Sequence, residues 1–261
     1  MKVESLIDFL DCAVDTRYVQ GAYDERGGVM IVGPPGSFKT TIICSAIEPH
    51  PTAMIVSDLN VQQWLKMKDD FVIERFTCLG FTDFEKVYQR HPATAQNIEG
   101  IIKALVSEGF GTGPGGDQRM PRMLARALVV GGMTQNCLER NYDNWQKNGF
   151  LRRFIWLLVG VQNSEAITQA IRRWEKIEFG KIAYRPANKQ IRVSMGPERS
   201  KQIEKAMKYQ AGLQGTGYVL MKKIVAVMEW KYGNNGRRNR VSELLEDISP
   251  ALSKDGGKLV L

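Results

Sequence analysis

The chain has 261 residues, of which 43% are hydrophobic and 25% are charged, as in globular proteins with a substantial core. It contains no apolar run of about eighteen residues, and its first fifteen residues, MKVESLIDFLDCAVD, place acids within the apolar stretch. Both features exclude membrane-spanning and secreted classes, so we expect a cytoplasmic protein without membrane contact. Residues 1–160 carry 17 Lys and Arg against 18 Asp and Glu, whereas residues 161–261 carry 19 against 10, which favours a polyanionic partner over a merely solvated surface.

Short apolar runs alternate with helical stretches over the first 160 residues. Residues 3–20 predict an amphipathic helix. The expected strands are 29–32, 52–60, 75–81, 123–132 and 150–161, with helical sequence after each of the first four. This order predicts an α/β fold, in which a parallel sheet of about five strands is sandwiched by helices.

The pattern changes beyond residue 161. Two helices are expected, at about 198–212 and 217–232, and basic residues are frequent. We therefore predict a core domain of residues 1–162 and a small, mainly helical, basic C-terminal appendage of residues 163–261, with a winged-helix-like arrangement as one form of it.

The segment between the first strand and its helix has the pattern of a phosphate-binding loop, G-x-x-x-x-G-K-[ST], except at one position. We assign phosphate binding to Gly33, Pro34, Pro35, Gly36, Ser37, Phe38, Lys39, Thr40 and Thr41. Backbone N–H groups at the start of a helix attract phosphate, Lys39 would neutralise its charge, and the Thr40 hydroxyl would ligate Mg²⁺. Phe38 replaces the second glycine, so its ring must point away from the phosphates, and Gly36 is expected to supply backbone freedom.

The sequence GPPGSFKT resembles the Walker A element of AAA+ and RecA-like P-loop ATPases, whose loops often read GPPGSGKT or GPPGTGKT. The resemblance is specific over residues 29–41 and extends in layout to about residue 160. It implies that ATP and Mg²⁺ are bound, that ATP is hydrolysed, and that a Walker B acid ends a later strand.

The third expected strand supplies that acid, because FTCLGFTDFE ends in Asp83 and Glu85. Asp83 would hold Mg²⁺, and Glu85 would orient or deprotonate the attacking water. In an extended segment the two carboxylates share a face. Asp58 at the end of the second strand is a competing acid, and Asp83 has a simpler alternative role as a helix cap.

Two further positions complete the expected catalytic set. Thr134, with Asn136 as second choice, follows the fourth strand and would sense the γ-phosphate. Arg152 and Arg153 begin the fifth strand, where alternation sends them to opposite faces, and the resemblance implies that one acts as an arginine finger on a neighbouring subunit. Ordinary surface pairing is the alternative.

Two basic segments are candidates for nucleic-acid contact. The Gly- and Pro-rich loop GTGPGGDQRMPR contains Arg119 and Arg122, with Arg126 shortly after it, and the C-terminal part contains Arg237, Arg238 and Arg240. Such arginines contact phosphates without reading sequence. We therefore expect a homo-oligomeric ring or filament that acts on nucleic acid, DNA in the first instance, as a helicase, helicase loader or strand-exchange ATPase. The alternatives are an ATP-driven protein remodeller, a small-molecule kinase, and a nucleotide binder without turnover.

Overall fold

The computed structural model describes residues 2–20, 25–111, 124–160, 165, 168, 172, 191–192, 195–207, 215–233, 238–247, 253–255 and 258–260. Within these residues a five-stranded parallel sheet has the order β3-β4-β7-β2-β8. Its strands are β2 (Gly28–Val32), β3 (Ala53–Val56), β4 (Cys78–Phe81), β7 (Leu128–Met133) and β8 (Phe154–Leu158). The sheet confirms the α/β fold predicted from the alternating pattern.

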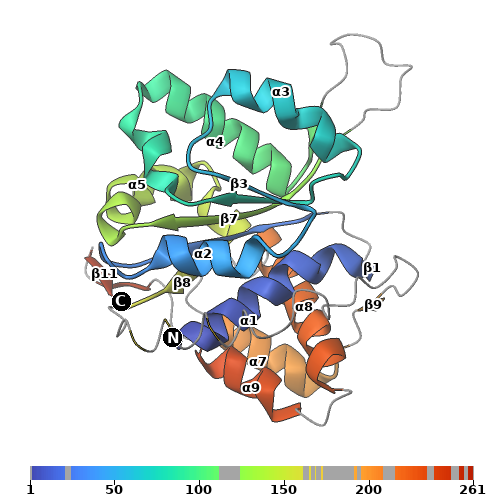
Figure 1. Cartoon of the computed structure of the whole chain (residues 1–261). Helices are drawn as coiled ribbons and strands as arrows, with labels where there is room; N and C mark the ends of the chain where they lie inside the picture. Colours follow the sequence, from blue (N-terminus) through green and yellow to red (C-terminus); the bar gives the residue numbers. More distant parts are fainter. Residues whose placement is uncertain are drawn as a thin grey trace.

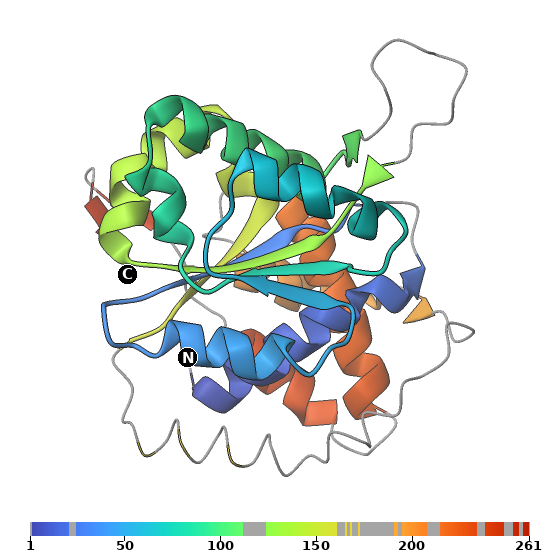
Figure 2. The same ribbon diagram turned by 45° about the horizontal axis from the view of Figure 1, so that its top comes forward.

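Helices cover both faces of this sheet (Figure 1). One face carries α3 (Val61–Val72), α4 (Pro92–Val106) and α5 (Gln135–Lys147). The other face carries α1 (Val3–Val14), α2 (Lys39–Ile47) and α8 (Thr216–Met228), with α7 (Pro197–Met207) and α9 (Arg238–Asp247) packed beyond them. Figure 2 shows the same two layers with the sheet between them.

Local sequence explains where several of these helices begin and end. Asn60 and Gln63 form a reciprocal capping box at the start of α3, and Pro92 occupies the first turn of α4, where its missing N–H costs no hydrogen bond. The expected helix 3–20 ends earlier, at Val14, and continues as the 3₁₀ turn η1 (Asp15–Tyr18) and the short strand β1 (Val19–Gln20).

The remaining short elements lie at the edges of the molecule. Strand β5 (Phe110–Gly111) pairs antiparallel with β6 (Leu124–Ala125), and β1 pairs parallel with β9 (Ile191–Arg192). Strand β10 (Ser253–Asp255) pairs with β11 (Lys258–Val260). No helix among the described residues has both the length and the apolar character needed to cross a bilayer.

The core consists of two hydrophobic clusters, one on each face of the sheet. The C-terminal helices belong to one of them: Leu220, Ile224 and Val227 of α8 are fully buried in the same cluster as residues of α1, α2 and β2. The expected boundary after residue 162 falls in residues 161–164, which lie outside the described part. The described C-terminal helices thus share their core with the sheet.

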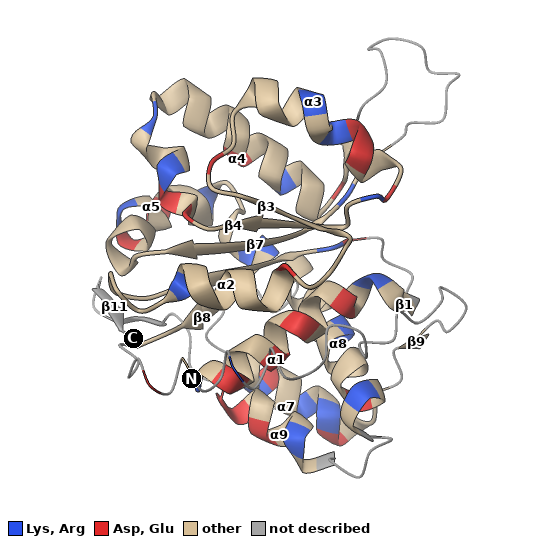
Figure 3. Cartoon of the chain, in the orientation of Figure 1, with Lys and Arg blue, Asp and Glu red and all other residues tan. Residues whose placement is uncertain are grey.

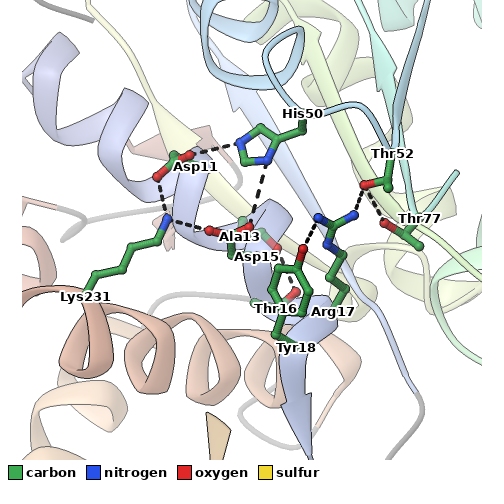
Figure 4. A network of polar contacts seen from close by, with 10 residues as sticks. All are labelled: Asp11, Ala13, Asp15, Thr16, Arg17, Tyr18, His50, Thr52, Thr77 and Lys231. Carbon is green, nitrogen blue, oxygen red and sulfur yellow. Dashed lines mark hydrogen bonds and ion pairs between the residues drawn. The ribbon is translucent and has the colours of Figure 1, made fainter. Parts of the chain in front are cut away.

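A buried polar network links the helices on the α1 and α2 face of the sheet (Figure 4). His50, which follows α2, contacts Asp11 of α1 at 2.9 Å, and Lys231 of the π-helical turn η4 (Glu229–Gly233) contacts Asp11 and Asp15 at 2.6 Å each. Burial alone would raise the pKa of Asp11, but Lys231 and His50 outweigh it and lower that pKa to about 2. Three separate segments of the chain therefore meet at one set of charges.

Candidate active site

The loop between β2 and α2 is a closed turn with an exposed outer surface. Gly33 has no room for a side chain, because an added Cβ would lie 2.4 Å from the carbonyl oxygen of Val159. The buried Ser37 donates its hydroxyl to the carbonyl of Pro34 at 2.8 Å. Pro34, Pro35 and Gly36 are exposed, whereas the N–H of Ser37 donates to the carbonyl of Pro34 at 3.3 Å.

Phe38 adopts a left-handed conformation, with φ 60° and ψ 23°, immediately before the first residue of α2. This conformation costs a residue with a Cβ roughly 1–2 kcal/mol. Gly36 also has a positive φ, of 75°, but Phe38 still adopts the left-handed conformation at the position where the pattern has its second glycine. Phe38 as a residue is 38% exposed.

Lys39 folds back over the loop. Its Nζ donates to the carbonyls of Gly33 at 2.9 Å and Pro34 at 2.8 Å, and lies 3.2 Å from the Ser37 hydroxyl. Burial lowers the pKa of Lys39, while the carboxylates of Glu85 and Asp83 partly counteract this effect. The ammonium group therefore lies in the field of both acids that the sequence proposed for the site.

Thr40 connects the loop to the Walker B candidate. Its hydroxyl donates to the carbonyl of Thr82 at 3.0 Å, and Thr82 immediately precedes Asp83. A hydroxyl and a carboxylate thus lie at adjacent ends of α2 and β4, and hard oxygen donors of this kind suit Mg²⁺. Among the described residues no group of three His, Cys, Asp or Glu side chains could hold a metal by itself. Any Mg²⁺ here would need phosphate and water as further ligands.

The segment after β4 differs from the extended form expected for it. Residues Phe84–Gln89 form a 3₁₀ turn, η2, and Asp83 caps it by accepting the N–H of Glu85 at 3.2 Å. The argument that alternation puts Asp83 and Glu85 on one face is therefore wrong, because a side-chain period of two holds only in a strand. Capping, the simpler role considered for Asp83, is present.

Glu85 reaches the end of the neighbouring strand. Its carboxylate accepts the main-chain N–H of Thr134, the residue after β7. The Thr134 hydroxyl caps α5 by accepting the N–H of Cys137 at 3.3 Å. Asn136 is exposed on the first turn of α5. The position expected to sense the γ-phosphate therefore lies beside Glu85, but its hydroxyl serves as a helix cap.

Asp58, the competing acid, has other partners. It accepts the N–H of Leu59 at 2.8 Å and forms an ion pair with Arg90. Gly132, by contrast, was not considered from the sequence and belongs to the site, because a Cβ there would lie 3.3 Å from the Cβ of Lys39. The paired glycines at 131–132 within an apolar strand were the available signal for a close approach of this kind.

The two arginines occupy the opposite end of the sheet. They belong to the 3₁₀ turn η3 (Leu151–Arg153), and β8 begins only at Phe154, so their expected alternation along a strand is wrong. Phe154 pairs with Gly28, the first residue of β2, so the strand length of roughly 15 Å separates η3 from the loop of the same chain. Arg153 donates to the carbonyl of Gly149 at 2.7 Å and to Ser107 at 3.2 Å, whereas Arg152 is exposed.

The residues expected to contact nucleic acid are partly within the described structure. Arg119, Arg122 and Arg237 lie outside the described residues, and Arg238 is described only as the first residue of α9. Arg126 donates to the carbonyl of Glu108 at 3.4 Å. Arg240 forms an ion pair with Asp8 of α1 at 2.8 Å. Figure 3 shows acidic positions along α1 and basic positions on the C-terminal helices next to it. Part of the C-terminal positive charge is therefore neutralised within the chain.

Comparisons with known proteins give distant likenesses to solved structures alone. No protein-family model and no curated protein matches the sequence. Among solved structures, the chain is similar to JCV helicase in complex with a substituted acetamide, at 10% identity and a TM-score of 0.30. The match covers 94% of this chain and 60% of that one, so this chain spans less than two thirds of the length of that structure. A likeness of this extent carries no argument about activity.

Proposed function

We propose that this protein is a Mg²⁺-dependent ATPase whose active site lies at the carboxyl edge of the sheet. The observation that carries the proposal is the convergence of three elements. Lys39 lies in the loop, within the electrostatic field of Asp83 and Glu85, and Thr40 is joined to the residue before Asp83. Sequence motif and geometry thus support the same site independently.

Each residue has a distinct role in this proposal. Exposed N–H groups of the loop and the start of α2 bind the β-phosphate, and Lys39 exchanges its loop carbonyls for phosphate oxygens. Thr40 and Asp83 hold Mg²⁺, which neutralises charge on the phosphates when bound. Glu85 positions the attacking water and accepts its proton, while the Thr134 N–H fixes the orientation of the carboxylate.

We further propose that hydrolysis drives work on nucleic acid, DNA in the first instance, in a homo-oligomeric ring or filament. The excess of nine positive charges in residues 161–261 supports a polyanionic partner. Arg152 is exposed and far from the loop of its own chain, so it could act on nucleotide only in a neighbouring subunit. Helicase, helicase loader and strand-exchange activities all meet this description.

A protein-remodelling ATPase is the second candidate. It is favoured by the contacts of Arg126 and Arg240 with acceptors in the same chain, which reduce the charge that these residues can offer to DNA. In this case the basic surface would bind an acidic protein.

The deciding experiment measures phosphate release from ATP and Mg²⁺, alone and with single-stranded or double-stranded DNA. Lys39→Ala and Glu85→Gln are the control variants, the second of which should bind nucleotide without turning it over. Turnover stimulated by DNA and lost in both variants supports the motor. Turnover that neither DNA affects at any salt concentration favours the protein remodeller, and absence of turnover in the wild type overturns the ATPase proposal.

A further inference from the structure

A buried carboxylate lies beneath the candidate active site. Glu99 of α4 is 4% exposed, and its oxygens accept hydrogen bonds from the hydroxyl of Tyr88 at 3.2 Å, the indole N–H of Trp145 at 3.2 Å and the amide of Asn148. Lys103 lies 3.6 Å away, one turn along the same helix. Burying a carboxylate is costly unless such donors surround it. Burial of Glu99 is therefore favourable only when these donors are held in one arrangement around its carboxylate.

The donors to Glu99 come from two elements that carry active-site groups. Tyr88 belongs to η2, the turn that Asp83 caps and that contains Glu85. Trp145 belongs to α5, the helix that Thr134 caps. Glu99 thus joins η2 to α5 from below, while the hydrogen bond from the Thr134 N–H to Glu85 joins the same two elements at the site itself.

Aromatic side chains pack closely between Glu99 and the turn that carries Glu85. The rings of Tyr88 and Trp145 are 5.2 Å apart, and Phe84, next to Glu85, packs on Phe150 at 6.1 Å. Burial, and then the neighbouring Glu99, raise the pKa of Tyr88 far above its ordinary value, so the phenol keeps its proton and donates. A rigid ring therefore links the buried carboxylate to the turn that carries Glu85.

We propose that Glu99 is a positioning residue of the ATPase, which acts through Tyr88 to hold Glu85 against the Thr134 N–H. The inference rests on the proposed function, because Glu85 is the water-positioning carboxylate there. Glu99 itself is buried in α4, outside the loop Gly33–Thr41. Its contribution is to the placement of η2, and displacement of a catalytic group by about 1 Å is enough to slow turnover by an order of magnitude or more.

Tyr88→Phe is the sharpest variant, since it removes the hydroxyl that joins η2 to Glu99 and keeps the ring against Trp145. Glu99→Gln is less informative, because its amide nitrogen would face donors and could unfold the region. Lys103→Gln is the matched control. It removes a contact to the same carboxylate, but Lys103 and Glu99 lie on one helix, so no link between elements is lost.

The test compares kcat and KM for ATP with hydrogen exchange at the Thr134 amide in the three proteins. For Tyr88→Phe we expect kcat to fall about ten-fold with KM unchanged, because the loop that binds nucleotide is untouched. Exchange at Thr134 should become about ten-fold faster, since its acceptor is no longer held in place. Lys103→Gln should match the wild type in both measurements.

Three outcomes would overturn the inference. Wild-type kcat and Thr134 exchange in folded Tyr88→Phe would show that Tyr88 holds nothing at the site, and equal losses in Lys103→Gln would show a general effect of Glu99 on stability. A wild type without turnover would remove the proposed function and the catalytic side of the inference. The exchange measurement would still decide whether Tyr88 holds Glu85 in place, so the two failures can be told apart.

Discussion

The hydroxyl of Thr40 donates a hydrogen bond of 3.0 Å to the main-chain carbonyl of Thr82. This bond joins the first turn of α2 to the end of β4, although β7 lies between β4 and β2, the strand that leads into α2. It places the hydroxyl proposed to ligate Mg²⁺ beside the residue that precedes Asp83. The two proposed metal ligands are therefore brought near each other by a hydrogen bond between protein groups.

Replacing Thr40 by Val should remove this hydroxyl at little cost to the fold, because the residue is exposed at the start of α2. We expect ATP turnover to fall by at least about ten-fold and the Mg²⁺ concentration for half-maximal turnover to rise. Thr40→Ser, which retains the oxygen, should stay near the wild type. Measuring phosphate release at increasing Mg²⁺ concentration gives the turnover rate and the Mg²⁺ requirement together. An unchanged Mg²⁺ requirement in Thr40→Val would exclude the Thr40 hydroxyl as a ligand.

Phe38→Gly should stabilise the protein. Glycine adopts φ 60° without the steric penalty that Phe38 bears, and the exposed ring contributes little packing, so we expect a gain of roughly 1 kcal/mol. For a chain of this size the melting temperature should rise by about 2–4 °C. Phe38→Ala is the control, since it removes the ring but keeps the Cβ and should show no such gain. A lower melting temperature for Phe38→Gly would mean that the ring makes a stabilising contact.

Stability should depend on the ionisation of Asp11. Its pKa is about 2 in the folded protein and 3.8 ordinarily, so the unfolded chain binds the proton more tightly. The stability from this carboxylate is complete above about pH 4 and is lost as the pH falls to about 2, amounting to ~2–3 kcal/mol. Urea unfolding between pH 2 and 7 measures it. Asp11→Asn should be less stable at neutral pH and should lose this part of the pH dependence, and an unchanged slope would assign the effect to other acids.

Arg152 and Arg153 should behave differently when replaced. Arg153→Met should lower the free energy of unfolding by about 1–3 kcal/mol, because the carbonyl of Gly149 and the hydroxyl of Ser107 lose a buried donor. Arg152→Ala should leave stability unchanged and, if it supplies the trans-acting cation, reduce turnover by on the order of 1000-fold.

Subunit mixing distinguishes a finger in trans from a local effect. Oligomers that combine Arg152→Ala with Lys39→Ala contain interfaces at which an intact loop meets an intact Arg152. Phosphate release should then exceed that of either variant alone. Mixed samples that stay inactive, or an Arg152→Ala protein with full turnover, would speak against the finger.

Apolar runs made the five strands predictable, because each central strand is buried on both faces and stands out from its polar flanks. The loop Gly33–Thr41 followed from its residue types, and Asp83 from its place after a buried strand. Strand order could not be deduced in this way. The insertion of β7 between β2 and β4, which brings Thr134 next to Glu85, is set by packing between segments far apart in the sequence.

The errors concern short turns. Residues 83–85 were treated as one extended segment and residues 151–153 as part of a strand, whereas Phe84–Gln89 and Leu151–Arg153 form 3₁₀ turns. A few residues provide too little periodicity to separate an extended segment from such a turn. The position of α8 was hidden for another reason. The helix expected at about 217–232 was assigned to a separate C-terminal appendage, but Lys223 is buried and donates to the carbonyl of Glu25 at 2.6 Å. A partner nearly two hundred residues away leaves no local signal.

Helix α2 is held at both ends by different chemistry. The proposed phosphate loop precedes its first residue, and three residues beyond its last one His50 is fixed between the charges of α1 and η4. We therefore expect this nine-residue helix not to shift along its own axis when nucleotide binds to the proposed loop. Any adjustment to the ligand must occur by rotation of main-chain bonds between Gly33 and Phe38. Conformational change at the site is thus confined to the six residues Gly33–Phe38. The strained backbone of Phe38 limits how far that change can go.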